Sequence, residues 1–355
     1  MSSPKKLIAI IGGTGAQGMP IVRDLVRSGT YSARVLTRDI TSARFKELQS
    51  YGPGSVEGVM GSFASEDALR DVFRGAWGAF AWELALEEGV KFYIHGNLDY
   101  GYKLSGFRPE FRCGHYDAKG RMAEWILLQN KQQQQVIPMR SAVFTTGPYI
   151  EMTIGKGTIF APEVDEEDGV VVWRVPLGNN GAVPFTAVDD CGVYVKYLFD
   201  NHDQTGGVDL RVALAHVTFG EYVQAFTKVT GKPARWEDTP DDVDGHLRRM
   251  WGERGDLPCG YNSDPDDPAT MSLRKNFTGW FNLWRHSGEN KGLVRRDYAL
   301  LDEIFPDRIK SVEEWIRRED EKGVREGLGS LWERIQPENL GHVLKLTEDK
   351  RQGKL

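Results

Sequence analysis

Apolar residues run unbroken from Leu7 to Ile11 and then recur every three or four positions from Met19 to Val26. An unbroken run of this length is typical of a buried parallel strand, and the wider spacing is typical of an amphipathic helix. Glycines at 12, 15 and 18 separate the two patterns. The order of strand, glycine-rich turn and helix predicts the start of a dinucleotide-binding unit.

Each glycine of this turn has a separate expected task. Gly12 permits the sharp turn, Gly15 lets a phosphate approach the backbone without meeting a Cβ atom, and Gly18 lets the helix pack closely on the strand. The free N–H groups and the positive dipole end of the helix then attract an anion. The residues expected to bind the cofactor here are Gly12, Thr14, Gly15, Ala16, Gln17 and Gly18. The competing interpretation is a glycine turn that holds no ligand.

Strand and helix patterns continue to alternate up to about residue 150. Strands are expected at 33–38, 56–62, 76–81, 90–95 and 142–149. Helices are expected from Ser65 to about Arg74, at 82–89 and from Tyr116 to about Leu128. The crossover at 82–89 is near the lower limit of about a dozen residues between parallel strands. We therefore expect a short or irregularly paired fourth strand, and no loop over the reactive end of a cofactor.

This alternation predicts an α/β fold: a Rossmann-type doubly wound parallel sheet with a smaller, mostly helical C-terminal substrate part. The cofactor domain is expected to span residues 1–155, with 183–214 returning to it. The substrate or lid part is expected at 156–182 and 215–330, and a helical tail at 331–355.

Two features of the last third have a predicted packing role. The tail is amphipathic from Leu331 to Leu346 and is expected to be a packing or dimer helix. Six tryptophans are expected to pack in the core and lid: Trp236, Trp251, Trp280, Trp284, Trp315 and Trp332.

Composition narrows the class of protein. Of the 355 residues, 40% are hydrophobic and 27% charged, as in a soluble globular protein, and the net charge of −6 gives no general reason to bind nucleic acid. Three scattered cysteines predict a reducing compartment without disulfides or a metal site. We expect a cytoplasmic protein without a signal peptide or membrane span, because the first strand begins at once and no apolar run approaches about 20 residues.

The end of the second strand predicts the choice of cofactor. A carboxylate there would bind a free ribose 2′-hydroxyl and repel a 2′-phosphate. The chain instead has Thr37 and then Arg38, whose guanidinium suits a phosphate, although Asp39 follows. Arg44 could add a second positive charge about one helical turn further on. We therefore expect NADP(H).

Two further contacts with the cofactor are expected at the ends of other strands. Gly61 and Ser62 follow the third strand, where adenine usually rests. Asn97 opens a polar, aromatic stretch at 97–112, which is expected to be an active-site loop.

Five motifs together resemble the NmrA-like family, an atypical branch of the short-chain dehydrogenase/reductase superfamily that is widespread in fungi. They are Gly-Gly-Thr-Gly-Ala-Gln-Gly at 12–18, Val-Leu-Thr-Arg at 35–38, His-Tyr-Asp-Ala-Lys-Gly at 115–120, Met-Arg-Ser-Ala-Val-Phe at 139–144 and Val-Pro-Phe-Thr-Ala-Val-Asp-Asp-Cys-Gly at 183–192. They follow the family's order. The resemblance covers about residues 5–320 and implies either a reductase or a dinucleotide-binding, redox-sensing regulator of a partner protein.

The resemblance also points to residues 115–119. Short-chain dehydrogenases commonly carry a tyrosine and a lysine four residues apart, and the lysine grips the nicotinamide ribose and lowers the pKa of the proton-donating phenol. Here Lys119 is preceded by His115 at four positions and by Tyr116 at three. The resemblance aligns His115 with the tyrosine. We expect Lys119 to bind the ribose and His115 or Tyr116 to act as the acid; the alternative is a packing role for both at the start of the helix.

The motifs of other common enzyme classes are absent from the sequence: Gly-x-Ser-x-Gly, His-Glu-x-x-His, Cys-x-x-Cys and the phosphate-binding Gly-Lys-Ser/Thr. We predict an NADP(H)-dependent oxidoreductase that acts on a small organic substrate, such as an aromatic or polyketide-like secondary metabolite. One alternative is a non-catalytic NADP(H) sensor that binds a protein partner through its tail, which the short crossover and His115 favour. Another is a damaged copy that binds cofactor poorly, and a homodimer is left open.

Overall fold

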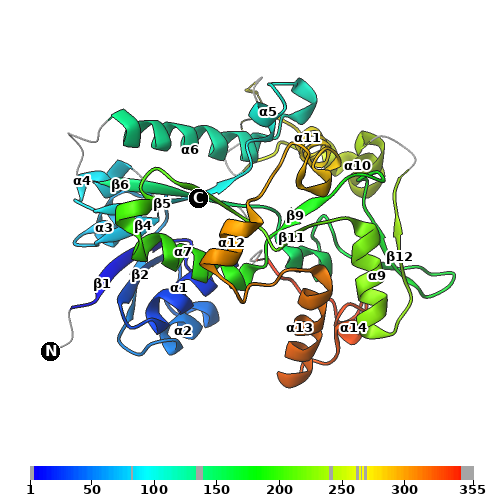
Figure 1. Cartoon of the computed structure of the whole chain (residues 1–355), viewed down its shortest axis with the longest axis horizontal. Coiled ribbons are helices and arrows are strands. Elements are labelled where there is room, and N and C mark those ends of the chain that lie inside the picture. Colours follow the sequence, from blue (N-terminus) through cyan, green and yellow to red (C-terminus); the bar gives the residue numbers. More distant parts are fainter. Residues whose placement is uncertain are drawn as a thin grey trace.

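The computed structural model describes residues 4–80, 83–132, 139–239, 243–260, 264, 266–267 and 270–344. Its centre is a sheet of seven parallel strands in the order β10-β6-β5-β4-β1-β2-β3 (Figure 1). These strands are β1 (Lys6–Ile11), β2 (Tyr31–Thr37), β3 (Val56–Met60), β4 (Gly78–Phe80), β5 (Phe92–Leu98), β6 (Arg140–Thr146) and β10 (Asp209–Val212). The strand order reverses between β1 and β4, which confirms the predicted Rossmann-type doubly wound sheet.

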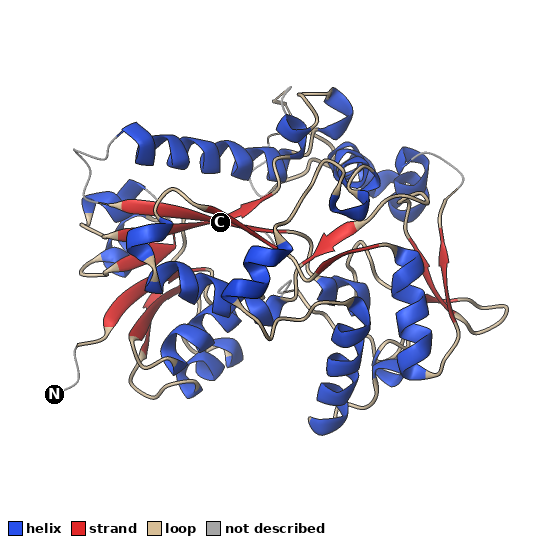
Figure 2. Cartoon of the chain, viewed as in Figure 1, coloured by secondary structure: helices blue, strands red, loops and turns tan. Residues whose placement is uncertain are grey.

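Helices cover both faces of this sheet (Figures 1 and 2). Side chains alternate along β1, so Ile8 and Ile10 pack with α1 (Gly18–Arg27) and α7 (Cys191–Asp200), whereas Ala9 packs toward α3 (Glu66–Phe73) and α6 (Gly114–Gln132). The first face also carries α2 (Ala43–Ser50) and α8 (His202–Thr205), and the second carries α4 (Glu83–Glu87). Burial of both faces explains the unbroken apolar run of β1.

The short crossover produces a short strand. β4 has three residues and pairs with β5 at two positions, Gly78 with Phe92 and Ala79 with Tyr93. Residues 81 and 82 lie outside the described residues. The expected short fourth strand is confirmed. β5 continues to Leu98, so in the described part of the chain its second half extends past the end of β4.

The C-terminal part contains two small sheets and most of the remaining helices (Figure 2). One sheet joins β12 (Ala234–Glu237), β8 (Val171–Arg174) and β7 (Glu163–Val164), and β11 (Ala215–Val217) pairs with β9 (Val183–Phe185). The helices are α9 (Phe219–Thr230), α10 (Val243–Trp251), α11 (Leu273–Arg285), α12 (Tyr298–Ile304), α13 (Val312–Arg325) and α14 (Leu331–Arg334). Short 3₁₀ turns lie at Pro109–Phe111, Ile150–Ile154, Val188–Asp190, Gly252–Asp256 and Gly288–Asn290.

The tryptophans of this part pack as predicted. Trp280, Trp284 and Trp315 are buried in one aromatic and aliphatic core. The other three lie partly buried against it: Trp236, Trp251 and Trp332. Their role is therefore structural.

Two expectations about local structure were wrong. The stretch 97–112 is not a simple loop, because β5 includes Asn97, α5 covers Gly101–Leu104 and a 3₁₀ turn covers Pro109–Phe111. A continuous helix over 331–346 is also not observed in the part of the tail that is described, up to residue 344. The helix stops at Arg334, three residues before Pro337, which cannot continue an α-helix.

Beyond α14, the described part of the tail packs back on the protein. The Lys156 N–H donates to the Gly341 carbonyl at 2.8 Å. Gly155 lies so close to Val343 that an added Cβ atom would come within 2.3 Å of a methyl group. Residues 345–355 of the predicted tail lie outside the described residues.

Candidate cofactor and active site

The glycine loop joins β1 to α1 with the geometry that its glycines allow. Gly12 has φ +77°, in the left-handed region that favours glycine. A Cβ atom on Gly18 would lie 2.2 Å from the Gly12 carbonyl oxygen, so only glycine lets α1 begin this close to the loop. In the described part of the chain, no side chain caps the start of α1. The Met19 N–H donates to the Gly15 carbonyl at 3.1 Å and Pro20 has no N–H, so this helix start offers an anion its positive dipole end and few free N–H groups.

Two basic residues follow β2, and one of them, Arg44, contacts the glycine loop. Arg38 follows the end of β2 and is exposed. Arg44 Nη1 donates to the Thr14 carbonyl at 3.3 Å, which ties the second cation to the glycine loop. The Asp39 Oδ1 accepts from the Thr41 hydroxyl at 2.6 Å and from the Thr41 N–H at 2.7 Å, and these two hydrogen bonds lower the pKa of Asp39.

The turn after β3 requires its glycine. A Cβ atom on Gly61 would lie 2.4 Å from the Cβ atom of Ala68 in α3. The Gly61 N–H donates to the Thr37 carbonyl at 2.9 Å, which joins the ends of β3 and β2. Ser62 turns its hydroxyl oxygen to the Ala64 N–H at 3.2 Å. Gly61 and Ser62 therefore lie at the carboxyl edge of the sheet, as the sequence predicted.

Lys119 reaches the same edge from α6. Its Nζ donates to the carbonyl of Gly96 in β5 at 3.0 Å. The ammonium remains accessible to solvent, but the protein around it removes water on one side, and this desolvation lowers the pKa of Lys119.

His115 lies at the start of α6 and is held by a residue that the sequence did not single out. The Gly114 N–H donates to Asn276 Oδ1 at 2.8 Å, which leaves Asn276 Nδ2 to donate to His115 Nδ1 at 3.0 Å. The neutral imidazole therefore carries its proton on Nε2. Desolvation is the main cause that lowers the pKa of His115, and the positive charge of Lys119 lowers it further. The positive charge of Lys119 is therefore close enough to His115 to affect its protonation.

Tyr116 points into the core instead. It is 3% exposed, and its ring meets Trp284 edge-on with the centroids 6.0 Å apart. Burial raises the pKa of its phenol well above the usual value. The structure therefore brings His115 and Lys119 together and places the Tyr116 ring among aromatic side chains of the C-terminal part.

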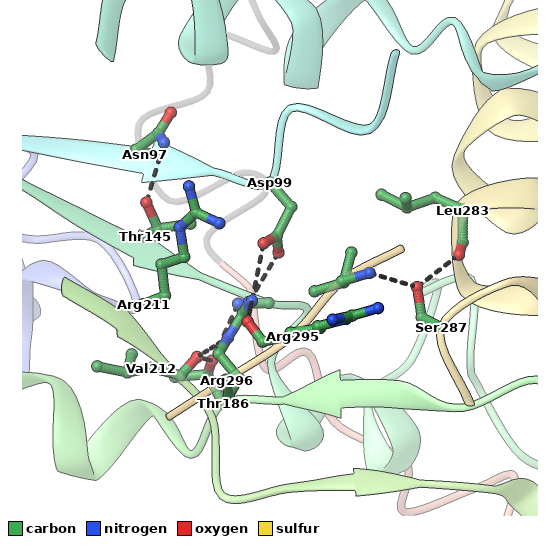
Figure 3. A network of polar contacts seen from close by, with 12 residues as sticks. Asn97, Asp99, Thr145, Thr186, Arg211, Val212, Leu283, Ser287, Arg295 and Arg296 are labelled. Atoms are coloured by element: carbon green, nitrogen blue, oxygen red, sulfur yellow. Dashed lines mark hydrogen bonds and ion pairs between the residues drawn. The ribbon is translucent and has the colours of Figure 1, made fainter. Parts of the chain in front are cut away.

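A buried ion pair fixes the C-terminal part to the strand ends (Figure 3). Asp99 follows β5, and its carboxylate accepts from both terminal nitrogens of Arg296 at 2.8 and 2.7 Å. Both residues are at most 4% exposed, and Arg296 Nε also donates to the Val212 carbonyl at the end of β10. Residues 197 positions apart thus meet beside Asn97.

A hollow of about 1400 Å³ lies beside the glycine loop, lined by residues of α1, α2, α13 and α14. Ala16 of the loop, Tyr149 after β6 and Trp315 of α13 line it. Its lining does not include His115 or Lys119. The hollow therefore adjoins the loop rather than the histidine and lysine.

Glu151 in the wall of this hollow is an unusual carboxyl group. Its Oε1 accepts from the Val188 N–H at 2.9 Å, and its Oε2 is buried without a hydrogen-bond partner among the described residues. Burial is the main cause that raises the pKa of Glu151 to about 8. Protonation removes the charge that would otherwise be buried.

Two further features were not found among the described residues. These residues contain no group of three or more His, Cys, Asp or Glu side chains that could hold a metal ion. None of their helices is both long and apolar enough to cross a lipid bilayer.

Comparison with known proteins places these features in context. The sequence profile described as "NmrA-like family" matches residues 4–253. The NmrA-like family domain-containing oxidoreductase lnaB of Aspergillus flavus is 27% identical over 339 residues, 84% of this chain and 98% of that protein. The corresponding oxidoreductase malD of Malbranchea aurantiaca is 26% identical over 351 residues, 91% and 99% of the two chains.

Solved structures share the fold. The crystal structure of NmrA, a negative transcriptional regulator, in complex with NAD has a TM-score of 0.67 at 13% identity, and the match covers 93% of this chain and 100% of that one. The NADPH complex of the quinone oxidoreductase QOR2 from Escherichia coli has a TM-score of 0.59 at 15% identity, covering 87% and 98%. Similarity at this level of identity establishes the fold alone.

Proposed function

The chain belongs to the NmrA-like family, and on that premise we propose that it is an NADP(H)-dependent oxidoreductase that transfers hydride between the cofactor and a small organic substrate. The observation that carries the proposal is the position of Lys119, whose ammonium reaches Gly96 at the carboxyl edge of the sheet. The glycine loop opens on the same edge, where ligands of doubly wound sheets bind. Relatives named as oxidoreductases match nearly the whole chain, and QOR2 binds NADPH.

Within this proposal, each part of the cofactor has a set of residues to hold it. The pyrophosphate would lie at the glycine loop formed by Gly12, Thr14, Gly15, Ala16, Gln17 and Gly18. Arg38 and Arg44 would bind the 2′-phosphate, and Gly61 and Ser62 would border the adenine. Asn97 and Lys119 would contact the nicotinamide riboside. The start of α1, which no side chain among the described residues caps, and the Arg44 side chain at the Thr14 carbonyl support this order.

The cofactor would supply the hydride, and the protein must supply or remove a proton. Lys119 and His115 are the two candidates near each other, and desolvation has lowered the pKa of both. A lowered pKa makes the Lys119 ammonium a stronger proton donor, whereas it keeps His115 neutral and suited to accept a proton. Tyr116 is the weaker candidate, because its phenol is buried beside Trp284.

We assign cofactor binding and substrate binding to the two different parts of the chain. Residues 1–155 with 183–214 would bind the cofactor, and 156–182 with 215–330 would close over the substrate. The tie between Asn276 in α11 and His115 in α6 supports such a closure, because a residue of the C-terminal part already touches the candidate acid.

A labelling experiment tests the proposal and does not require the substrate to be identified first. NADPH deuterated at both C4 positions is incubated with the protein and an extract of host metabolites. We expect mass spectrometry to find a metabolite that gains deuterium with the intact protein but not with Gly15→Trp. Tight NADPH binding without any labelled product would instead contradict hydride transfer.

The second candidate is a non-catalytic NADP(H) sensor that binds a protein partner. NmrA itself is described as a negative transcriptional regulator and has been solved with NAD and with NADP. The three-residue β4 and the histidine at position 115 favour this function. Tight cofactor binding, absent label transfer and capture of a partner that depends on the cofactor's redox state would together support it.

A further inference from the structure

Three side chains on neighbouring strands form a hydrogen-bonded row at the carboxyl edge of the sheet. Asp209 begins β10, Thr145 lies near the end of β6 and Asn97 near the end of β5. Thr145 Oγ1 lies 2.5 Å from Asp209 Oδ1, and Asn97 Nδ2 lies 2.9 Å from Thr145 Oγ1. Figure 3 shows the contact between Asn97 and Thr145 across the two strands. Both of these residues are buried.

The charged end of the row fixes the direction of every hydrogen bond in it. An ionised carboxylate can only accept, so the Thr145 hydroxyl donates to Asp209. The Thr145 oxygen is then left to accept, and the Asn97 amide donates to it. The amide of Asn97 therefore has a single orientation, with Oδ1 turned away from Thr145. Arg211, paired with the other Asp209 oxygen at 2.7 Å, lies outside this row.

Asn97 Oδ1 is left as a buried acceptor with no hydrogen-bond partner among the described residues. Buried polar atoms are nearly always hydrogen-bonded, so this exception calls for a donor from outside the described residues. The oxygen belongs to the half of β5 that extends past β4, and the preceding residue, Gly96, accepts from Lys119. The missing donor therefore belongs at the candidate cofactor site.

We propose that Thr145 and Asp209 are positioning residues, which orient Asn97 to accept a hydrogen bond from the nicotinamide riboside half of the dinucleotide. The inference rests on the proposed function, because it takes that half of the cofactor to lie beside Lys119. The ligand group is an N–H or O–H donor, and the riboside offers two kinds: the carboxamide N–H₂ and the ribose hydroxyls. Neither Thr145 nor Asp209 needs to touch the cofactor for this role.

The test is a double-mutant cycle on cofactor affinity. The dissociation constant of NADP⁺ is measured for the wild type, Asn97→Leu, Asp209→Asn and the double variant. A lost neutral hydrogen bond should weaken binding about 3- to 10-fold in Asn97→Leu, and somewhat less in Asp209→Asn. Because Asp209 acts through Asn97, the double variant should bind no more weakly than Asn97→Leu. Arg211→Gln, which changes the same carboxylate's other partner, should bind as the wild type does.

A matched pair at Thr145 keeps the test decisive if Asp209→Asn fails to fold. Thr145→Ser keeps the hydroxyl and should bind NADP⁺ normally, whereas Thr145→Val removes it and should match Asp209→Asn. Wild-type affinity in Thr145→Val or Asp209→Asn, or additive losses in the double variant, would overturn the positioning role. A wild-type protein that does not bind NADP⁺ at all would overturn the proposed function, and the inference with it.

The 3-acetylpyridine analogue of NADP⁺ identifies the donor. It replaces the carboxamide amino group by a methyl group and keeps both riboses. If the carboxamide is the donor, Asn97→Leu should erase the wild-type preference for NADP⁺ over the analogue. If a ribose hydroxyl is the donor, Asn97→Leu should weaken both ligands by the same factor.

Discussion

At the scale of single residues, burial explains the unusual chemistry of this protein. Desolvation lowers the pKa of Lys119 and of His115 and raises the pKa of Glu151. The sequence could identify Lys119 by its spacing from His115, but it could not show that the Tyr116 ring turns into the core. Nor could it identify Asn276, because the hydrogen bond to His115 joins residues 161 positions apart.

The charge of Lys119 should control the pH dependence of cofactor binding. A lysine with a lowered pKa loses its proton at a lower pH than a free lysine, so NADPH affinity should fall as pH rises toward about 10. Lys119→Met should bind about 10-fold more weakly at about pH 7 and lose this pH dependence. The measurement is a fluorescence titration with NADPH between about pH 6 and 10.

Lys119→Arg is the matched control, because its guanidinium stays charged throughout this range. It should show no fall in affinity above about pH 8. An identical decline in Lys119→Arg and wild type would assign the pH dependence to another group.

Glu151 should make the folded state less stable as pH rises. The pKa of Glu151 in the folded state, about 8, lies above the ordinary value of 4.5. Its protonated form therefore contributes fully to the stability of the folded state below pH 4.5, and this contribution is lost as the pH rises through 8. Glu151→Gln keeps an oxygen for the Val188 N–H and cannot ionise. The unfolding free energy of Glu151→Gln relative to the wild type should increase by roughly 2–3 kcal/mol from about pH 5.5 to about pH 8.5.

Urea unfolding at the two pH values measures this gain. Glu253→Gln, at an exposed position, is the control and should shift the unfolding free energy equally at both. A gain in Glu151→Gln that does not grow with pH would mean that the carboxyl is ionised in the folded protein.

At the scale of elements, hydrophobic periodicity predicted the doubly wound sheet and most of its helices. It also predicted the short β4, because the spacing of 82–89 leaves little room for a crossover. It failed where local signals were mixed. Aromatic residues at 97–112 suggested a loop, and the amphipathic pattern from Leu331 hid the effect of Pro337, which ends the last helix at Arg334.

The contact between α1 and the glycine loop can be tested at Gly18. An added Cβ atom would meet the Gly12 carbonyl at 2.2 Å, so Gly18→Ala should push α1 away from the loop. We expect a loss of about 1–3 kcal/mol in unfolding free energy and at least about 10-fold weaker NADPH binding. Thermal unfolding and a binding titration measure the two effects.

Gly220→Ala is the control substitution, because Gly220 lies in the first turn of another helix, α9. A Cβ atom there has only one neighbour within 4 Å, at 3.9 Å. This variant should be stabilised by about 0.4–1 kcal/mol, because alanine restricts the unfolded chain without a clash. Equal effects of the two substitutions would show that α1 tolerates a side chain at its start.

At the scale of the whole molecule, contacts between distant segments determine the candidate site. Asp99 and Arg296 meet at the ends of β5 and β10, and no local pattern in the sequence pairs them. The same holds for the row of Asp209, Thr145 and Asn97. The sequence predicts which strand ends converge, but the pairing of individual side chains depends on how the C-terminal part packs.

Arg296→Met should be strongly destabilising. It leaves the Asp99 carboxylate buried without its partner, which costs about 3–5 kcal/mol. Arg295→Met, at the exposed neighbouring position, should change unfolding free energy by less than about 1 kcal/mol. Urea unfolding of both variants provides the measurement, and similar values for the two would contradict a dominant role for the buried pair.

The ion pair between Asp99 and Arg296 also limits how the protein can be divided. A fragment that ends after β10 would contain every strand of the main sheet, yet it would bury Asp99 without a counterion. The cofactor-binding half should therefore not fold as an autonomous fragment, whereas two co-expressed fragments divided between residues 214 and 296 should associate and restore the fold. During synthesis, the last strand of the sheet ends at Val212, but Arg296 is made 84 positions later, so folding of this chain is expected to be completed only after most of it has left the ribosome.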